Sequence, residues 1–102
     1  MAQLRRGVAE NCVLALLSGG EQYGFDLARL LVGRHGVIAS EGSIYPVLAR
    51  LRRNGLVKTI WRESVEGPPR RYYSLTAAGE RSLATFKEHW KGFRDTIDDV
   101  LS

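Results

Sequence analysis

The sequence is poor in the residue types that carry covalent and metal chemistry. Cys12 is its single cysteine, so a disulfide within the chain is impossible, and its apolar neighbours predict a buried, unreactive thiol in a reducing compartment. The two histidines, His35 and His89, are too isolated to form a metal site with one cysteine. No Gly-rich phosphate loop and no recognisable Ser, His and Asp set is present. We therefore expect a protein that is not an enzyme and that uses no metal or cofactor.

Long hydrophobic runs are also missing. The apolar run at residues 12–17 is too short to cross a bilayer, and Glu10 and Asn11 interrupt the stretch before it. Because neither a signal peptide nor a membrane span is visible, we expect a cytoplasmic protein without membrane contact.

Acidic residues are scarce in the first three quarters of the chain. Residues 1–75 carry eleven Lys or Arg against six Asp or Glu, whereas residues 76–102 carry four against five. The net charge of +4 therefore arises from an excess of +5 in the first part, which favours nucleic acid or another polyanion as a partner. A length of 102 residues is enough for one modest core.

Three helices are expected in the first half, at about residues 3–18, 23–34 and 43–54. The third has the clearest limits, with Ser43 as a side-chain N-cap, Pro46 in the first turn and Gly55 as the stop. Its apolar residues recur with helical spacing and form one inward stripe: Ile44, Val47, Leu48 and Leu51.

The opposite face of this third helix is centred on Pro46, Ala49 and Arg53. Tyr45, Arg50 and Arg52 flank it, so the face combines a small-residue tip with cations. That composition suits a helix that reads the major groove of DNA. The alternative is an ordinary solvated surface, which is common for Arg on short helices.

Two strands are expected next, at residues 56–62 and 71–75, because both stretches are rich in β-branched and aromatic residues. Residues 63–70 contain Gly67 and two prolines and must form a loop. A hairpin directly after a recognition helix is the wing of a winged helix. Arg70 and Arg71 would lie at its base, where they either reach phosphate or the minor groove or serve as solubilising charges.

Thr76 is expected to cap a final helix that extends to about residue 101. Its apolar residues follow alternating gaps of three and four, which is the stripe of a coiled coil. Because such a long helix projects beyond a small core, its exposed aromatic side chains predict a homodimer, the alternative being packing on its own domain. Trp90, in the middle, is either an interface residue or a platform for a flat hydrophobic ligand. The stripe consists of Leu83, Phe86, Trp90, Phe93, Ile97 and Val100.

Over residues 13–90 the sequence resembles the PadR family of bacterial winged-helix transcriptional regulators. The resemblance is carried by Tyr23 and Gly24, EGSIYP at 41–46, Leu48, Leu51, NGL at 54–56, GPPRRYYSLT at 67–76, and Gly79. Departures are mild: Ser43 replaces the commoner Thr, Ile44 replaces Leu and Phe25 replaces Tyr.

The resemblance implies a dimeric repressor, in a family whose members control genes for detoxification, drug efflux or stress responses. It places Ser43, Tyr45 and Pro46 at the DNA-facing tip of the recognition helix and Arg70 and Arg71 in the wing. It also makes Trp90 the aromatic residue that would stack a planar hydrophobic effector at the dimer interface.

Together these observations predict a mainly α (α+β) fold, a winged helix-turn-helix with a two-stranded β wing and a long C-terminal dimerisation helix. Residues 1–75 would form the DNA-binding domain and residues 76–102 the dimerisation helix. A homodimer would bind a palindromic operator in double-stranded DNA. The alternative function is a winged-helix protein interaction module without specific DNA binding. The predicted DNA contacts are Arg5, Arg6, Ser43, Tyr45, Pro46, Ala49, Arg50, Arg53, Arg70 and Arg71.

Overall fold

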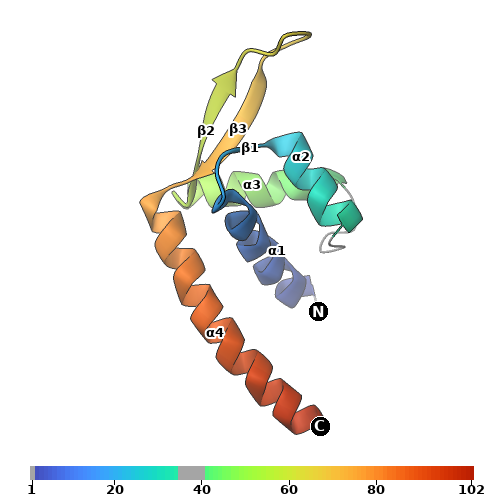
Figure 1. Cartoon of the computed structure of the whole chain (residues 1–102), viewed down its shortest axis with the longest axis vertical. Coiled ribbons are helices and arrows are strands. Elements are labelled where there is room, and N and C mark those ends of the chain that lie inside the picture. Colours follow the sequence, from blue (N-terminus) through green and yellow to red (C-terminus); the bar gives the residue numbers. More distant parts are fainter. Residues whose placement is uncertain (1, 35–40) are drawn as a thin grey trace.

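The computed structural model describes residues 2–34 and 41–102, and it has the winged helix-turn-helix architecture predicted from the sequence (Figure 1). None of the helices in these ranges combines the length and the hydropathy that a bilayer crossing requires. The elements in chain order are α1 (Ala2–Leu17), β1 (Gln22–Tyr23), α2 (Gly24–Arg29), a π-helical turn (Leu30–Arg34), a 3-10 turn (Glu41–Ser43), α3 (Ile44–Arg53), β2 (Val57–Arg62), β3 (Arg70–Leu75) and α4 (Ala77–Leu101).

The core lies between α1, α2, α3 and the inner face of the sheet. The inward stripe of α3 is buried as predicted, and it packs with apolar residues of α1 and α2. Burying each of these Leu, Ile and Val side chains stabilises the fold by roughly 1.5–3 kcal/mol. The core residues of the three helices and of the π-helical turn are Val13, Leu14, Leu17, Leu27, Ala28, Leu31, Ile44, Val47, Leu48 and Leu51.

The start of α3 differs from the prediction. Ser43 occupies the N-cap position, but its backbone is helical, with φ −71° and ψ −18°, and its side chain makes no capping hydrogen bond. The reason is that the 3-10 turn Glu41–Ser43 enters the helix directly, whereas a side-chain N-cap needs an extended backbone. The C-terminal stop is as expected, since Gly55 has φ +73°, a conformation that favours glycine.

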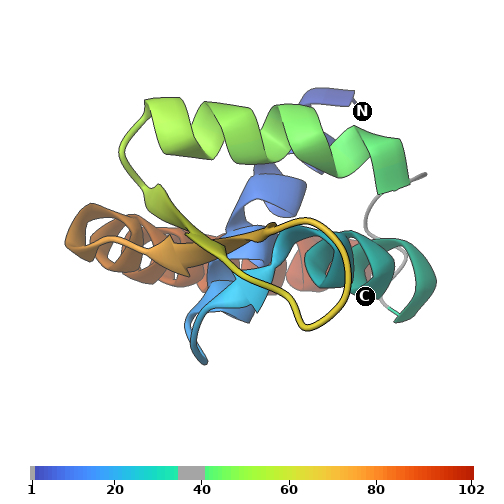
Figure 2. The same ribbon diagram turned by 90° about the horizontal axis from the view of Figure 1, so that it is seen from above.

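Within residues 2–34 and 41–102 the sheet has three antiparallel strands in the order β1-β3-β2, one more than predicted. The hairpin strands pair from Val57 with Leu75 to Arg62 with Arg70, and the additional strand β1 pairs Tyr23 with Tyr72. Seen from above, α3 and α2 lie on either side of the hairpin, whose loop projects beyond the helices (Figures 1 and 2).

The root of α4 is attached to the turn between α3 and β2. Thr76 caps the helix as predicted: its Oγ1 accepts the N–H of Gly79 at 3.0 Å and donates to the carbonyl oxygen of Gly55 at 2.6 Å. The N–H of Thr76 donates to the carbonyl oxygen of Leu56 at 3.2 Å. A side chain at Gly79 would overlap the Leu56 carbonyl, so the glycine permits this close approach.

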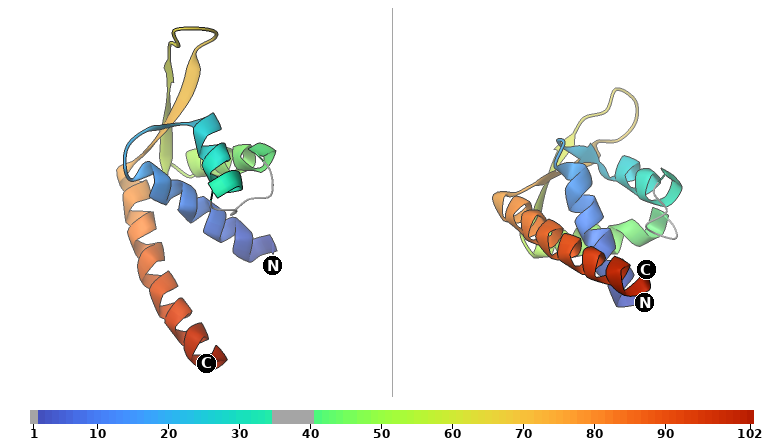
Figure 3. Two further views of the ribbon diagram at one scale, coloured as in Figure 1. Left: turned by 45° about the vertical axis from the view of Figure 1, so that its right-hand side comes forward. Right: turned by 60° about the horizontal axis from the view of Figure 1, so that its bottom comes forward.

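Most of α4 extends away from the core, at the opposite end of the molecule from the wing (Figures 1 and 3). Every residue of α4 is described, and Gly79 and Leu83 are the two that are buried. Leu83 was predicted to face a partner together with the rest of the stripe. It belongs instead to the core of its own chain, because it lies within two turns of the helix root.

Candidate nucleic-acid interface

The outer face of α3 is exposed as predicted. Ser43, Tyr45, Pro46, Ala49 and Arg53 are all on the surface, and 49% of Tyr45 is accessible. Their inward neighbours on the helix are fixed by burial, so the backbone that presents this face is rigid. The face has the dimensions of one short helix and carries no acidic residue within α3 itself.

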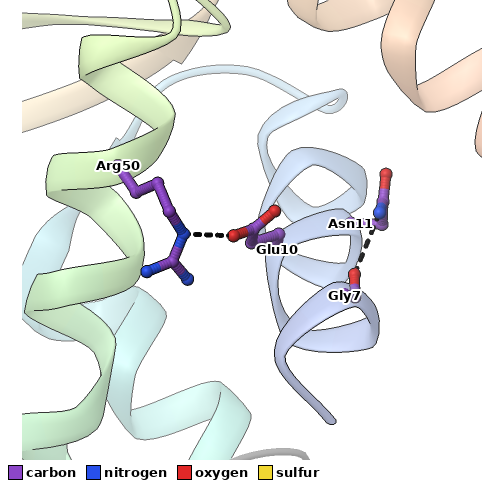
Figure 4. A network of polar contacts seen from close by, with 4 residues as sticks. All are labelled: Gly7, Glu10, Asn11 and Arg50. Carbon is purple, nitrogen blue, oxygen red and sulfur yellow. Dashed lines mark hydrogen bonds and ion pairs between the residues drawn. The ribbon is translucent and has the colours of Figure 1, made fainter. Parts of the chain in front are cut away.

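Arg50 departs from this outer face and packs against α1. Its Nε donates to Oε1 of Glu10, and the side chains are 19% and 24% exposed (Figure 4). Arg50 was predicted to contact DNA; in this structure its carboxylate partner lies within the chain, on α1, and its contact with DNA stays a prediction. The ion pair ties α3 to α1 and so helps to fix the outer face.

Arg5 and Arg6, which were also predicted to contact DNA, lie in the first turns of α1. Their backbone is helical, whereas their side chains lie outside the described part of the structure. One turn further along, Asn11 donates to the carbonyl oxygen of Gly7 at 2.9 Å (Figure 4).

The outer face of the wing carries arginines stacked on tyrosines. Because paired residues of antiparallel strands share a face, the registers place Arg62, Arg70, Tyr72 and Tyr23 on the same side of the sheet. The Arg70 guanidinium carbon lies 4.8 Å from the centre of the Tyr23 ring, and that of Arg62 lies 5.8 Å from the Tyr72 ring. Such stacking orders a guanidinium while leaving its edge available to an anion.

The inner face of the wing presents a second stacked pair, Trp61 and Arg71. The guanidinium carbon of Arg71 lies 4.7 Å from the Trp61 ring centre, and 60% of Trp61 is exposed. Within the described part of the chain, Nε of Arg71 is buried without a hydrogen-bond partner. Trp61 was not among the predicted site residues. Its position opposite Arg71 follows from the strand register, which the strand sequences alone do not define.

Glu21 and Arg62 form an ion pair across this sheet that sequence patterns also failed to indicate. Nε and Nη2 of Arg62 donate to Oε1 and Oε2 of Glu21, the second at 2.9 Å. Hydrogen bonding to Arg62 lowers the pKa of the Glu21 carboxyl, and the same contact raises the pKa of Arg62. Forty-one residues separate the two, so no local spacing could have paired them.

The loop at the tip of the wing is folded back on itself. Ser64 Oγ lies 2.8, 3.2 and 3.0 Å from the carbonyl oxygens of Glu66, Gly67 and Pro68, and its single proton is shared among them. Gly67 has φ +94°, which permits the turn. The loop that follows β2 therefore has a defined shape.

Beyond Leu83, the predicted stripe of α4 forms an apolar surface that is exposed except at Phe86, which is half-buried. Phe86 and Trp90 have ring centres 6.0 Å apart and nearly parallel planes, and Trp90 and Phe93 lie 6.3 Å apart. Ile97 and Val100 continue the surface toward the C-terminus, and both are exposed. We call these five residues the α4 stripe. Among the described residues no cluster of His, Cys, Asp and Glu suits a metal ion.

Comparison with known proteins agrees with this architecture. The model of the transcriptional regulator PadR-like family matches residues 13–85. Transcriptional regulator Rv3488 of Mycobacterium tuberculosis is 35% identical over 83 residues, which are 81% of this chain and 76% of that protein.

Solved structures give the same result. A PadR-like transcriptional regulator from Bacillus cereus superimposes with a TM-score of 0.86 at 36% identity, covering 98% of this chain and 97% of that one. Bacillus subtilis PadR, solved in complex with operator DNA, gives a TM-score of 0.70 at 26% identity over 78% of this chain and 46% of its own. The chain therefore belongs to the PadR-like family of transcriptional regulators, which are not enzymes.

Proposed function

We propose that the protein binds a specific operator in double-stranded DNA, with α3 in the major groove and the wing against the adjacent backbone. The observation that carries the proposal is the exposed face of α3, with Tyr45 at its tip and Arg53 near its end, on a helix whose other face is fully buried. The solved complex of the related Bacillus subtilis PadR with operator DNA supports it.

Each part of this face has its own task in the proposal. Ser43, Tyr45, Pro46 and Ala49 approach base edges, since short side chains at a helix tip allow close entry into the groove. Arg53 contacts phosphate, which fixes the register of the helix on the duplex. The remaining predicted contacts, Arg5, Arg6, Arg50, Arg70 and Arg71, supply further positive charge.

Binding to a labelled duplex from upstream of the protein's own gene, compared with a scrambled duplex, tests the proposal. We expect a preference of ~10³-fold or more at near-physiological salt. Tyr45→Ala should reduce that preference. Arg53→Ala should weaken binding to both duplexes and lower the salt slope by about 0.9. Lys91→Ala removes the same charge from α4, away from α3 and the wing, and should leave binding unchanged. If binding to the two duplexes weakens equally as the salt concentration rises, specific binding is refuted.

We further propose that residues 76–102 form a dimerisation helix that pairs two copies through the α4 stripe. Support comes from its exposed aromatic residues, including Phe93, which is 54% exposed. Two copies related by a two-fold axis would recognise a palindromic operator with half-sites ~34–36 Å apart. Phe93→Glu should convert dimers to monomers in sedimentation, whereas a persistent dimer would show that the interface lies elsewhere.

In this proposal the protein is a cytoplasmic repressor that responds to a planar hydrophobic compound stacked on Trp90. The 39% exposure of Trp90 and its parallel neighbour Phe86 support such a site. Fluorescence quenching by a flat aromatic compound in a Trp61→Phe variant would report on Trp90 alone. No quenching and no change in operator affinity would contradict the ligand response.

The exposed α4 stripe also supports a second candidate function, a protein interaction module in which α4 binds a different protein. Salt separates the two functions, because a phosphate contact weakens steeply with salt and an apolar contact does not. Heparin should compete for the protein in the first case and not in the second.

A further inference from the structure

We propose that Glu21 is a specificity-determining residue, which acts by occupying the Arg62 guanidinium and so withholding it from random DNA. The inference rests on the proposed DNA-binding function. It assigns a role to an acidic residue that lies in the turn before β1, away from α3.

The geometry of the pair is that of a carboxylate in the place of a phosphate. Both oxygens of Glu21 accept from Arg62, from Nε and from Nη2, and this two-point arrangement is the one that guanidinium groups also use for phosphate. While Glu21 holds these two donors, a phosphate can bind them only by displacing the carboxylate.

The location of the pair makes this competition relevant to DNA. Arg62 is the last residue of β2, which ends where the loop of the wing begins, and the end of this strand projects beyond the helices (Figure 1). Its guanidinium stacks on Tyr72, and Arg70 stacks on Tyr23 on the same face. Glu21 therefore neutralises one of the two stacked arginines of this face.

The exposure of both partners shows that the pair can exchange with solvent anions. The Arg62 side chain is 51% exposed and that of Glu21 is 35% exposed. An exposed ion pair of this kind contributes little net free energy. A well-placed phosphate can therefore replace the carboxylate, whereas a loosely held phosphate gains little binding energy by replacing it. Specificity is a ratio of affinities, and lowering the affinity for random DNA raises it.

The experiment measures anisotropy of a labelled random-sequence duplex over a range of salt concentrations. Wild-type protein is compared with Glu21→Gln, with Arg62→Gln and with the double variant. Glu66→Gln is the matched control, since it removes one carboxylate from the wing loop without touching Arg62. Circular dichroism verifies that each variant is folded.

We expect Glu21→Gln to bind random DNA roughly three- to tenfold more tightly at low salt. Its salt slope should steepen by about 0.9, the value for one additional neutralised phosphate. Glu66→Gln should keep the wild-type slope. In the Arg62→Gln background, Glu21→Gln should leave the slope unchanged, because the residue acts through Arg62.

Three outcomes would overturn the inference while leaving DNA binding intact. In the first, Glu21→Gln has the same salt slope as Glu66→Gln. In the second, Glu21→Gln steepens the salt slope even in the Arg62→Gln background. In the third, Glu21→Gln binds random DNA more weakly than the wild-type protein does. The last would mean that the pair orients the wing for DNA. Failure of the wild-type protein to bind any duplex would instead refute the proposed function and this inference together.

Discussion

Replacing Gly79 with alanine tests the attachment of α4 to the winged domain. An added Cβ would overlap the carbonyl oxygen of Leu56 and lie 2.9 Å from Cδ2 of Leu75. Carbon atoms pack best at about 3.5–4.0 Å, so the second contact alone is too short by roughly 0.6 Å or more. The first involves backbone, which cannot turn aside as a flexible side chain does. The root of α4 must therefore move.

The expected cost follows from what that movement disturbs. Overpacking in a close contact costs roughly 1–3 kcal/mol. Displacing the root also strains the two hydrogen bonds that Thr76 makes to Gly55 and Leu56, each worth about 1 kcal/mol. The higher helix propensity of alanine offsets about 1 kcal/mol of this destabilisation. We therefore expect Gly79→Ala to lower the free energy of unfolding by about 2–4 kcal/mol.

Urea denaturation followed by far-UV circular dichroism, at one fixed protein concentration, measures this difference. Gly92→Ala is the matched control, because Gly92 lies in the same helix with nothing within 4 Å of its would-be Cβ. The free energy of unfolding of Gly92→Ala should rise by roughly 0.5–1 kcal/mol. If both variants prove equally stable, the close approach at Leu56 does not exist in solution and the reasoning fails.

Three other measurements address polar groups. Glu10→Gln should destabilise the fold by about 1 kcal/mol in urea, because it weakens a half-buried ion pair with Arg50, and an unchanged midpoint would show that the pair contributes nothing. In an NMR titration the pKa of Glu21 should lie below its ordinary value, and it should rise in Arg62→Gln. The stability that this pair contributes is therefore present at neutral pH and is lost as acid protonates the carboxyl. Equal pKa values of Glu21 in both proteins would exclude the pair. Burial raises the pKa of Cys12, so its alkylation at mildly alkaline pH should be slower in the folded than in the unfolded protein, and equal rates would contradict the burial.

The elements with a clear repeat could be predicted from the sequence. Helix α3 is the best case, because Ile44, Val47, Leu48 and Leu51 recur with helical spacing and Gly55 ends the pattern. The hairpin was found to within one residue at each strand, since its loop contains residues that cannot continue a ladder. The resemblance to the family was confirmed by the family model and by solved structures.

Features that depend on distant parts of the chain could not be predicted. Strand β1 consists of two residues, too few for any alternation to be recognised, and it exists because β3 offers a free edge. The ion pairs of Arg50 and Arg62 span 40 and 41 residues. Leu83 matches the heptad stripe in spacing, and only the position of the helix root decides that it packs inward. The DNA contacts and the dimer interface remain predictions.

The attachment of α4 at one end turns this helix into a lever. From Gly79 to Leu101 the axis measures ~33 Å at 1.5 Å per residue, so a rotation of about 5° at the root moves the far end by roughly 3 Å. In a dimer held through the α4 stripe, the same angle would set the distance between the two α3 helices. Substitutions around Gly55 and Gly79 would then change which half-site spacing the dimer accepts, although they touch neither the DNA nor the partner.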